Sequence, residues 1–160
     1  GRSNTKFIIA PHQIKPEAIT VLRNKISKKV VLYSEKNNKD LSDYQVLIID
    51  TIGLLTRIYN YADIAYIGGA AGNTGLHNIL EAATFGIPVI TGKNIRKFPE
   101  AVQLRKLAGL YTVNNYPELQ ECLDKLIKDK SFREKTGMIA GHFINSNVGA
   151  TGIIERYLRS

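Results

Sequence analysis

Cysteine and long apolar runs are scarce in this 160-residue sequence. Its single cysteine, Cys122, excludes a disulfide within the chain and a metal site built from several cysteines, as is typical of a reducing compartment. No apolar run approaches the roughly 18 to 20 residues of a membrane-spanning helix, and the N-terminal residues lack the pattern of a signal peptide. We therefore expect a soluble, unprocessed chain.

Acidic residues are outnumbered by basic ones, 14 against 22, which gives a formal net charge of +8. This excess makes an anionic partner worth considering: a nucleotide, a nucleic acid or an anionic membrane surface. The basic residues are spread over several segments without a sustained basic helix or an aromatic RNA-binding signature, so we expect no nucleic acid. A solvated basic surface explains the same distribution.

Short apolar runs alternate with helical patterns, which is typical of a parallel sheet with helical crossovers. The predicted strands are 6–10, 29–33, 45–49, 64–67, 88–90 and 110–113. The first predicted helix begins at Pro16. The other predicted helices cover 53–61, 78–85, 99–107, 119–127, 131–144 and 152–158. Asp50 and Thr51 have the short polar side chains that would cap the helix over 53–61.

These elements predict one α/β domain, with a Rossmann-like doubly wound parallel sheet of about six strands in the order 3-2-1-4-5-6. Ligands of such sheets bind beyond the carboxyl ends of the strands, where the strand order reverses. The segments that this order places there are Pro11–His12 and Gly68–Asn78.

The segment from Gly68 to Gly86, GGAAGNTGLHNILEAATFG, carries the clearest signal for a ligand. Its glycines permit positive φ angles and a close approach of the backbone to a ligand, and a helix start favours a phosphate or carboxylate. His77 and Asn78 fall at that helix start, and Glu81 lies one turn further on, where it can accept hydrogen bonds from two sugar hydroxyls.

Each of these residues also has a purely structural interpretation. The glycines suit any tight strand-to-helix turn, His77 can make a local hydrogen bond, Asn78 can cap the helix, and Glu81 is a favourable charge in a first turn. The glycines follow the fourth predicted strand and do not have the G-x-G-x-x-G spacing, so the segment is not a dinucleotide fingerprint. It is not a Walker loop either, because no Gly-Lys-Ser/Thr follows.

Together with its neighbours, this segment resembles the bacterial 3-deoxy-D-manno-octulosonic acid (Kdo) transferases. The matching stretches are DTIGLL (50–55), YADIAYIGG (61–69), GLHNILEAATFGIPVITG (75–92), KFPEA (97–101) and Gly149-Ala150-Thr151. Leu76 and Lys93 depart from the pattern, since many members have glycine at the first position and proline at the second. The resemblance covers essentially the whole chain and implies the C-terminal half of a GT-B glycosyltransferase.

The resemblance implies CMP-Kdo as the donor substrate, with no further cofactor and no metal. It places the ribose against Glu81 and the cytosine beside Thr51, Ile52 and Gly53. It also places the phosphate and the sugar against a further group of residues, here called the first group. The first group comprises Gly68, Gly69, Gly75, His77 and Asn78, with Pro11 and His12 on the opposite wall. Lys93, Asn94 and Lys97 can supply polar or cationic contacts to the sugar carboxylate or the phosphates, or can be exposed loop residues. Thr51 can also be a plain helix cap.

The same resemblance implies a lipid A precursor as the acceptor, bound by an N-terminal domain that also supplies the catalytic base, at the cytoplasmic face of the inner membrane. We therefore expect this chain to bind donor without efficient turnover and to contain no catalytic residue of its own. Two other interpretations stay open: a different GT-B enzyme, such as a UDP-sugar transferase or a sugar-nucleotide epimerase, or a basic module that binds nucleic acid or a membrane surface.

Overall fold

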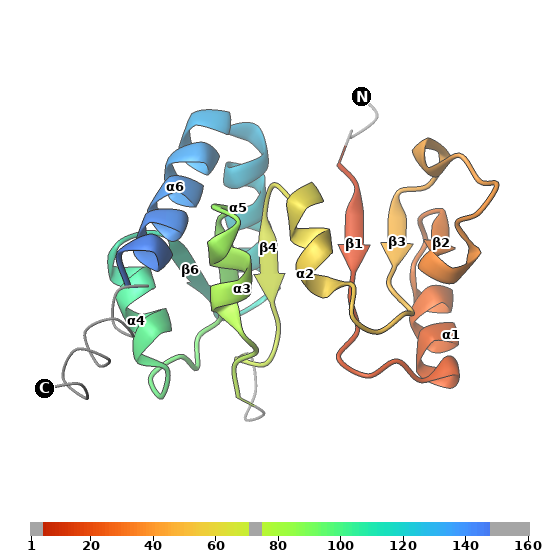
Figure 1. Cartoon of the computed structure of the whole chain (residues 1–160), viewed down its shortest axis with the longest axis horizontal. Helices are drawn as coiled ribbons and strands as arrows, with labels where there is room; N and C mark the ends of the chain where they lie inside the picture. The colour runs from red at the N-terminus through yellow and green to blue at the C-terminus, as the bar shows by residue number, and fades with distance from the viewer. Residues whose placement is uncertain (1–4, 71–74, 148–160) are drawn as a thin grey trace, which may run out of the picture. The chain divides into compact units, whose positions relative to one another are not determined.

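The computed structural model of the chain describes residues 5–70 and 75–147. They form two compact units, divided between Arg57 and Ile58, and each unit contains a parallel three-stranded sheet (Figure 1). The predicted helix over 152–158 and the Gly149-Ala150-Thr151 segment lie outside the described residues. The expectation of a single domain stays a prediction.

The first unit has three short strands and one long helix. Its elements are β1 (Phe7–Ile9), α1 (Pro16–Lys25), β2 (Val30–Leu32) and β3 (Val46–Ile48), and the short helix α2 (Leu55–Ile58) ends at the division between the units. Short 3₁₀ turns at Tyr33–Glu35 and Leu41–Asp43 lie between β2 and β3. Helix α1 begins with proline at its first turn, where the missing N–H costs no hydrogen bond.

The strand order in this unit corrects the sequence-based prediction. The order is β1-β3-β2, with Ile8 and Val31 both in register with Leu47, so β3 is the central strand (Figure 1). The predicted order 3-2-1 placed it at the edge. The physical reason is burial, because Val46 and Ile48 of β3 are both buried, whereas β2, which was predicted to lie between β3 and β1, has only Val31 buried.

The second unit holds the larger core. Its elements are β4 (Ala65–Ile67), α3 (Ile79–Thr84), β5 (Val89–Gly92), α4 (Pro99–Lys106), β6 (Leu110–Val113), α5 (Tyr116–Lys128) and α6 (Lys130–Asn147). The strands are parallel in the order β4-β5-β6, as predicted, and β5 is buried throughout. A continuous buried run is expected of a central strand covered on both faces.

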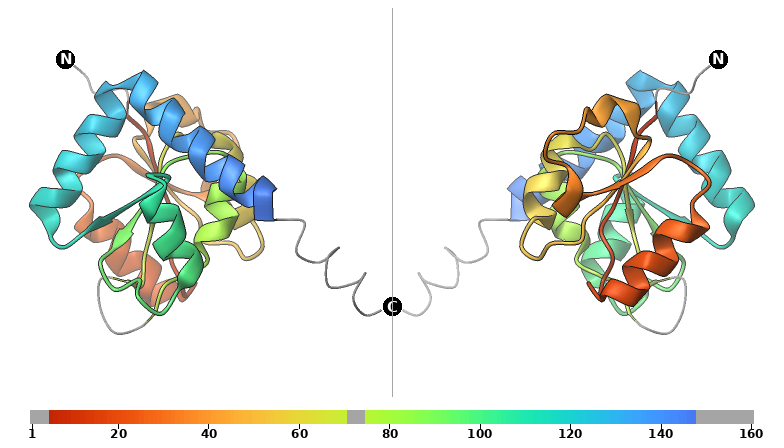
Figure 2. Two further views of the ribbon diagram at one scale, coloured as in Figure 1. Left: turned by 90° about the vertical axis from the view of Figure 1, so that its left-hand side faces the viewer. Right: turned by 90° about the vertical axis from the view of Figure 1, so that its right-hand side faces the viewer.

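Helices α3 and α6 pack closely on each other, and α6 also packs on α5, with which it forms the hairpin seen in Figure 2. Glycines allow the first contact: a Cβ placed on Gly137 would lie 2.1 Å from the carbonyl oxygen of Gly86. Gly86 itself has φ +65° just after α3, the left-handed conformation that ends many helices. This packing fixes α3 and therefore the segment that leads into it.

Candidate functional site

The chain folds back on itself directly after β4. The amide of His77 donates to the carbonyl of Gly68, with an N···O distance of 3.4 Å. Gly69 has φ +99°, and a Cβ placed on it would lie only 2.0 Å from the carbonyl oxygen of Gly75. Only glycine fits such a position. The expected positive φ is therefore found at Gly69 and Gly75 but not at Gly68, and both ends of the loop lie against each other.

The end of β5 holds this glycine loop in place. The hydroxyl of Thr91, which is fully buried, donates to the carbonyl of Ile67 at 2.8 Å, one residue before Gly68. The amide of Asn94 donates to the carbonyl of Ala70 at 3.0 Å. The carboxyl ends of β4 and β5 therefore form one connected edge, on which the side chains of Lys93 and Asn94 are exposed.

Asn78 is the N-cap of α3 and also contacts Glu81. Its Oδ1 accepts from the amide of Leu80 at 3.0 Å, and its Nδ2 donates to Oε1 of Glu81 at 3.1 Å. Residues three apart on a helix share a face, so the sequence spacing predicted this neighbourhood. The capping interpretation of Asn78 is confirmed, and the ligand contacts expected of His77, Asn78 and Glu81 stay predictions.

Tyr59 is a neighbour of Glu81 that no sequence pattern indicated. Its side chain is 8% exposed, and its ring packs on Phe85 with centroids 5.7 Å apart. Burial raises the pKa of the Tyr59 hydroxyl, and the nearby Glu81 carboxylate raises it further. Tyr59 therefore belongs to the surroundings of Glu81.

The other predicted site residues belong to the first unit, at the carboxyl edge of its own sheet. Pro11 and His12 follow β1, and Thr51, Ile52 and Gly53 follow the neighbouring strand β3. Ile52 is 86% exposed, and Gly53 has φ +84° with open space where a Cβ would be. This exposed turn delays the start of α2 to Leu55, two residues later than predicted.

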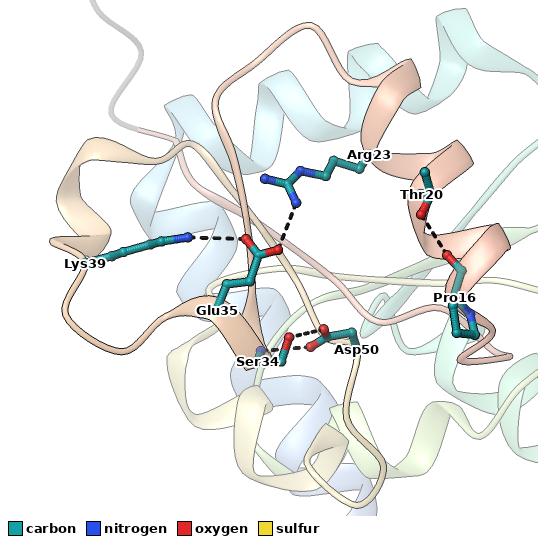
Figure 3. A network of polar contacts seen from close by, with 7 residues as sticks. All are labelled: Pro16, Thr20, Arg23, Ser34, Glu35, Lys39 and Asp50. Atoms are coloured by element: carbon teal, nitrogen blue, oxygen red, sulfur yellow. Dashed lines mark hydrogen bonds and ion pairs between the residues drawn. The ribbon is translucent and has the colours of Figure 1, made fainter.

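Asp50 does not cap α2, contrary to the prediction. Its carboxylate accepts hydrogen bonds from both the amide of Ser34, at 2.9 Å, and the Ser34 hydroxyl (Figure 3). Partial burial works to raise the pKa of Asp50, but these hydrogen bonds outweigh it and hold the pKa below its ordinary value. The physical reason is that Ser34 follows the adjacent strand β2 and offers two donors at once.

The remaining charged contacts of this unit lie at the surface. Glu35 bridges Arg23 at 3.0 Å and Lys39 at 3.2 Å (Figure 3). The hydrogen bond from Lys39 is the main cause that lowers the pKa of Glu35, although slight desolvation opposes it. Such exposed pairs typically contribute less than about 1 kcal/mol to stability. We therefore attribute no ligand to this network.

Two kinds of feature are not found in the part of the chain that the structure describes. Over residues 5–70 and 75–147, no three His, Cys, Asp or Glu side chains come together in a way that could hold a metal ion. In the same residues, no helix has the length and apolar character needed to cross a membrane.

Curated proteins of similar sequence bear on the function of this chain. The chain is 30% identical over 151 residues to the 3-deoxy-D-manno-octulosonic acid transferase of Haemophilus influenzae, covering 92% of this chain and 35% of that protein. It is 34% identical over 147 residues to the transferase of the same name from Aquifex aeolicus, covering 89% of this chain and 40% of that protein. The chain is a sequence relative of the Kdo transferases. It spans little more than a third of the length of these relatives.

A solved structure has the same fold as this chain. It is the crystal structure of the C-terminal CMP-Kdo binding domain of WaaA from Acinetobacter baumannii, with a TM-score of 0.68 and 15% sequence identity. The superposition covers 88% of this chain and 90% of that domain. The Rossmann-like α/β fold expected from the sequence is thereby confirmed. No model of a known protein family matches the chain.

Proposed function

We propose that this chain is the donor-binding domain of a Kdo transferase and binds the CMP portion of CMP-Kdo. The observation that carries the proposal is the folded-back glycine loop after β4, with the Glu81 carboxylate one helical turn beyond it. Backbone amides of such loops suit phosphate, and a carboxylate suits the two hydroxyls of a ribose. The relatives named as Kdo transferases, and the fold shared with a CMP-Kdo binding domain, support the choice of nucleotide.

In the proposed complex, Gly68, Gly69 and His77 line the phosphate and Glu81 accepts from the ribose. Lys93 and Asn94, at the end of β5, donate to the carboxylate of the sugar or to the phosphate. A hydrogen bond to such a charged group is stronger than one between neutral groups. The chemistry of the parent enzyme is displacement of CMP from the anomeric carbon of Kdo, and these donors stabilise the charge that develops on the departing phosphate.

The acceptor belongs to the same proposal. A lipid A precursor would be bound, and its hydroxyl deprotonated, by a domain outside this chain, at the cytoplasmic face of the inner membrane. We therefore propose binding by this chain without efficient turnover, and no cofactor or metal. Exposed basic side chains such as Lys25 and Lys28 would favour an anionic membrane surface, which predicts weaker vesicle binding as salt rises.

Calorimetric titration of the chain with CMP tests the proposal, with UMP and UDP as controls and Glu81→Ala as the variant. We expect CMP to bind more tightly than either control and the variant to lose about tenfold or more in affinity, as expected for hydrogen bonds to a charged group. Equal or tighter binding of UDP would indicate a different GT-B enzyme. Salt-sensitive binding to nucleic acid without nucleotide preference would indicate a basic binding module.

A further inference from the structure

Two helices of the second unit begin with the same Asn-x-x-Glu pattern. In α3 the residues are Asn78 and Glu81, and in α5 they are Asn115 and Glu118. Each asparagine oxygen accepts from a helix amide, that of Leu80 at 3.0 Å in α3 and that of Glu118 at 2.9 Å in α5. Each asparagine Nδ2 donates to the glutamate Oε1, at 3.1 and 3.2 Å respectively. The two caps therefore provide an internal comparison.

The two glutamates differ in how many of their carboxylate oxygens accept hydrogen bonds from the described residues. Oε2 of Glu118 accepts from the amide of Asn114 at 2.8 Å and from its Nδ2 at 2.7 Å, so both carboxylate oxygens are occupied. These bonds, led by the one from the Asn114 amide, lower the pKa of Glu118. Both carboxylate oxygens of Glu118 therefore accept hydrogen bonds at the start of α5.

Glu81 differs because only its Oε1 has a hydrogen-bond partner among the described residues. Its Oε2 accepts no hydrogen bond from them, although a carboxylate offers about four acceptor positions. Among the described residues, the cap on α3 thus leaves Oε2 of Glu81 without a hydrogen-bond partner, whereas the cap on α5 leaves neither carboxylate oxygen of Glu118 without one.

We infer that Asn78 is a positioning residue, whose side-chain amide holds Oε1 of Glu81 so that Oε2 is presented to the hydroxyl groups of a nucleotide ribose. This inference rests on the proposed function and names the residue that orients its ribose-binding carboxylate. Asn78 acts through Glu81 and does not contact the phosphate. Without the amide donor, a glutamate at this position turns back to the N-cap backbone N–H, as in a capping box.

Asn78→Ser tests the inference, and Asn115→Ser is the matched control. Serine caps helices nearly as well as asparagine, so both variants should melt within about 3 °C of the unmodified chain. Asn78→Ser removes the amide that holds Glu81, and we expect it to weaken CMP binding about tenfold, the effect of one hydrogen bond to a charged group. Asn115→Ser should leave CMP affinity unchanged.

A double-mutant cycle then separates positioning from direct contact. If Asn78 acts through Glu81, the effect of Asn78→Ser on CMP affinity disappears in a Glu81→Gln background. An Asn78→Ser variant that binds CMP as tightly as the unmodified chain would overturn the inference, and so would an equal loss in the Glu81→Gln background. In both cases the unmodified chain still binds CMP and the proposed function stands. If the unmodified chain binds no CMP, the proposed function fails, and the inference fails with it.

Discussion

Gly69 is the residue at which the geometry of the glycine loop makes the sharpest prediction. An alanine there would have to adopt φ near +99° and would place its Cβ 2.0 Å from the carbonyl oxygen of Gly75 and 3.2 Å from Cδ2 of His77. Left-handed backbone costs an ordinary residue about 1 to 2 kcal/mol. Forcing an extra carbon into packed backbone costs about 1 to 3 kcal/mol more. We therefore expect Gly69→Ala to destabilise the chain by about 2 to 5 kcal/mol, the sum of these two costs.

Two other glycines separate these costs. Gly68→Ala meets only an ordinary contact, 3.8 Å from His77 Cδ2, without a positive φ, so it should change the free energy of unfolding by less than about 0.5 kcal/mol. Gly53→Ala has φ +84° but nothing within 4 Å of its Cβ, so it should cost only the backbone term of about 1 to 2 kcal/mol.

The assay is chemical denaturation followed by circular dichroism, with CMP titration of each variant. If the loop opens to relieve the clash in Gly69→Ala, the stability loss shrinks but CMP affinity falls instead. The prediction is wrong if Gly69→Ala matches Gly68→Ala in stability and binds CMP as tightly as the unmodified chain.

Three further predictions concern packing and hydrogen bonding. Gly137→Ala places its Cβ 2.1 Å from the carbonyl oxygen of Gly86 and should lower the free energy of unfolding by about 2 to 3 kcal/mol, despite the better helix propensity of alanine. The control Gly141→Ala places its Cβ 3.3 Å from Gly86 Cα and should change the free energy of unfolding by less than about 1 kcal/mol. Equal effects of the two variants would contradict the packing of α3 on α6. Thr91→Val removes a buried 2.8 Å hydrogen bond and should cost about 1 to 2 kcal/mol, and an unchanged denaturation midpoint would be evidence against that bond. Ser34→Ala removes a donor that lowers the pKa of Asp50 and, after allowance for solvent, should cost about 1 kcal/mol near neutral pH. Because the folded pKa of Asp50 is depressed, this loss is fully present above the ordinary value of 3.8 and disappears as pH falls through the folded pKa; a loss that persists in denaturation at pH 2 would exclude this cause.

Local pattern predicted most of the elements of this chain. The bounds predicted for β6, 110–113, match the structure, and the starts predicted for α1 and α4 match at their prolines, because proline fixes φ at a helix start. The spacing of Asn78 and Glu81 placed both on one helix face. Such features depend on neighbouring residues alone.

The sequence did not predict features that depend on residues far apart along the chain. The central place of β3 depends on which strand buries most surface against α1, and the hydrogen bond between Asp50 and Ser34 joins residues 16 positions apart that follow two neighbouring strands. Tyr59 comes near Glu81 only through tertiary packing. A sequence period specifies which face of an element is apolar but not which element will cover it.

An NMR titration of the isotope-labelled chain with CMP would show both how tightly CMP binds and which residues it contacts. We expect the largest amide shifts at Gly68, Gly69 and the residues from His77 to Glu81, and smaller shifts with UMP at equal concentration. Shifts confined to the basic residues 23–29, or no response to CMP at saturating concentration, would contradict the assignment of the donor nucleotide to the glycine loop after β4.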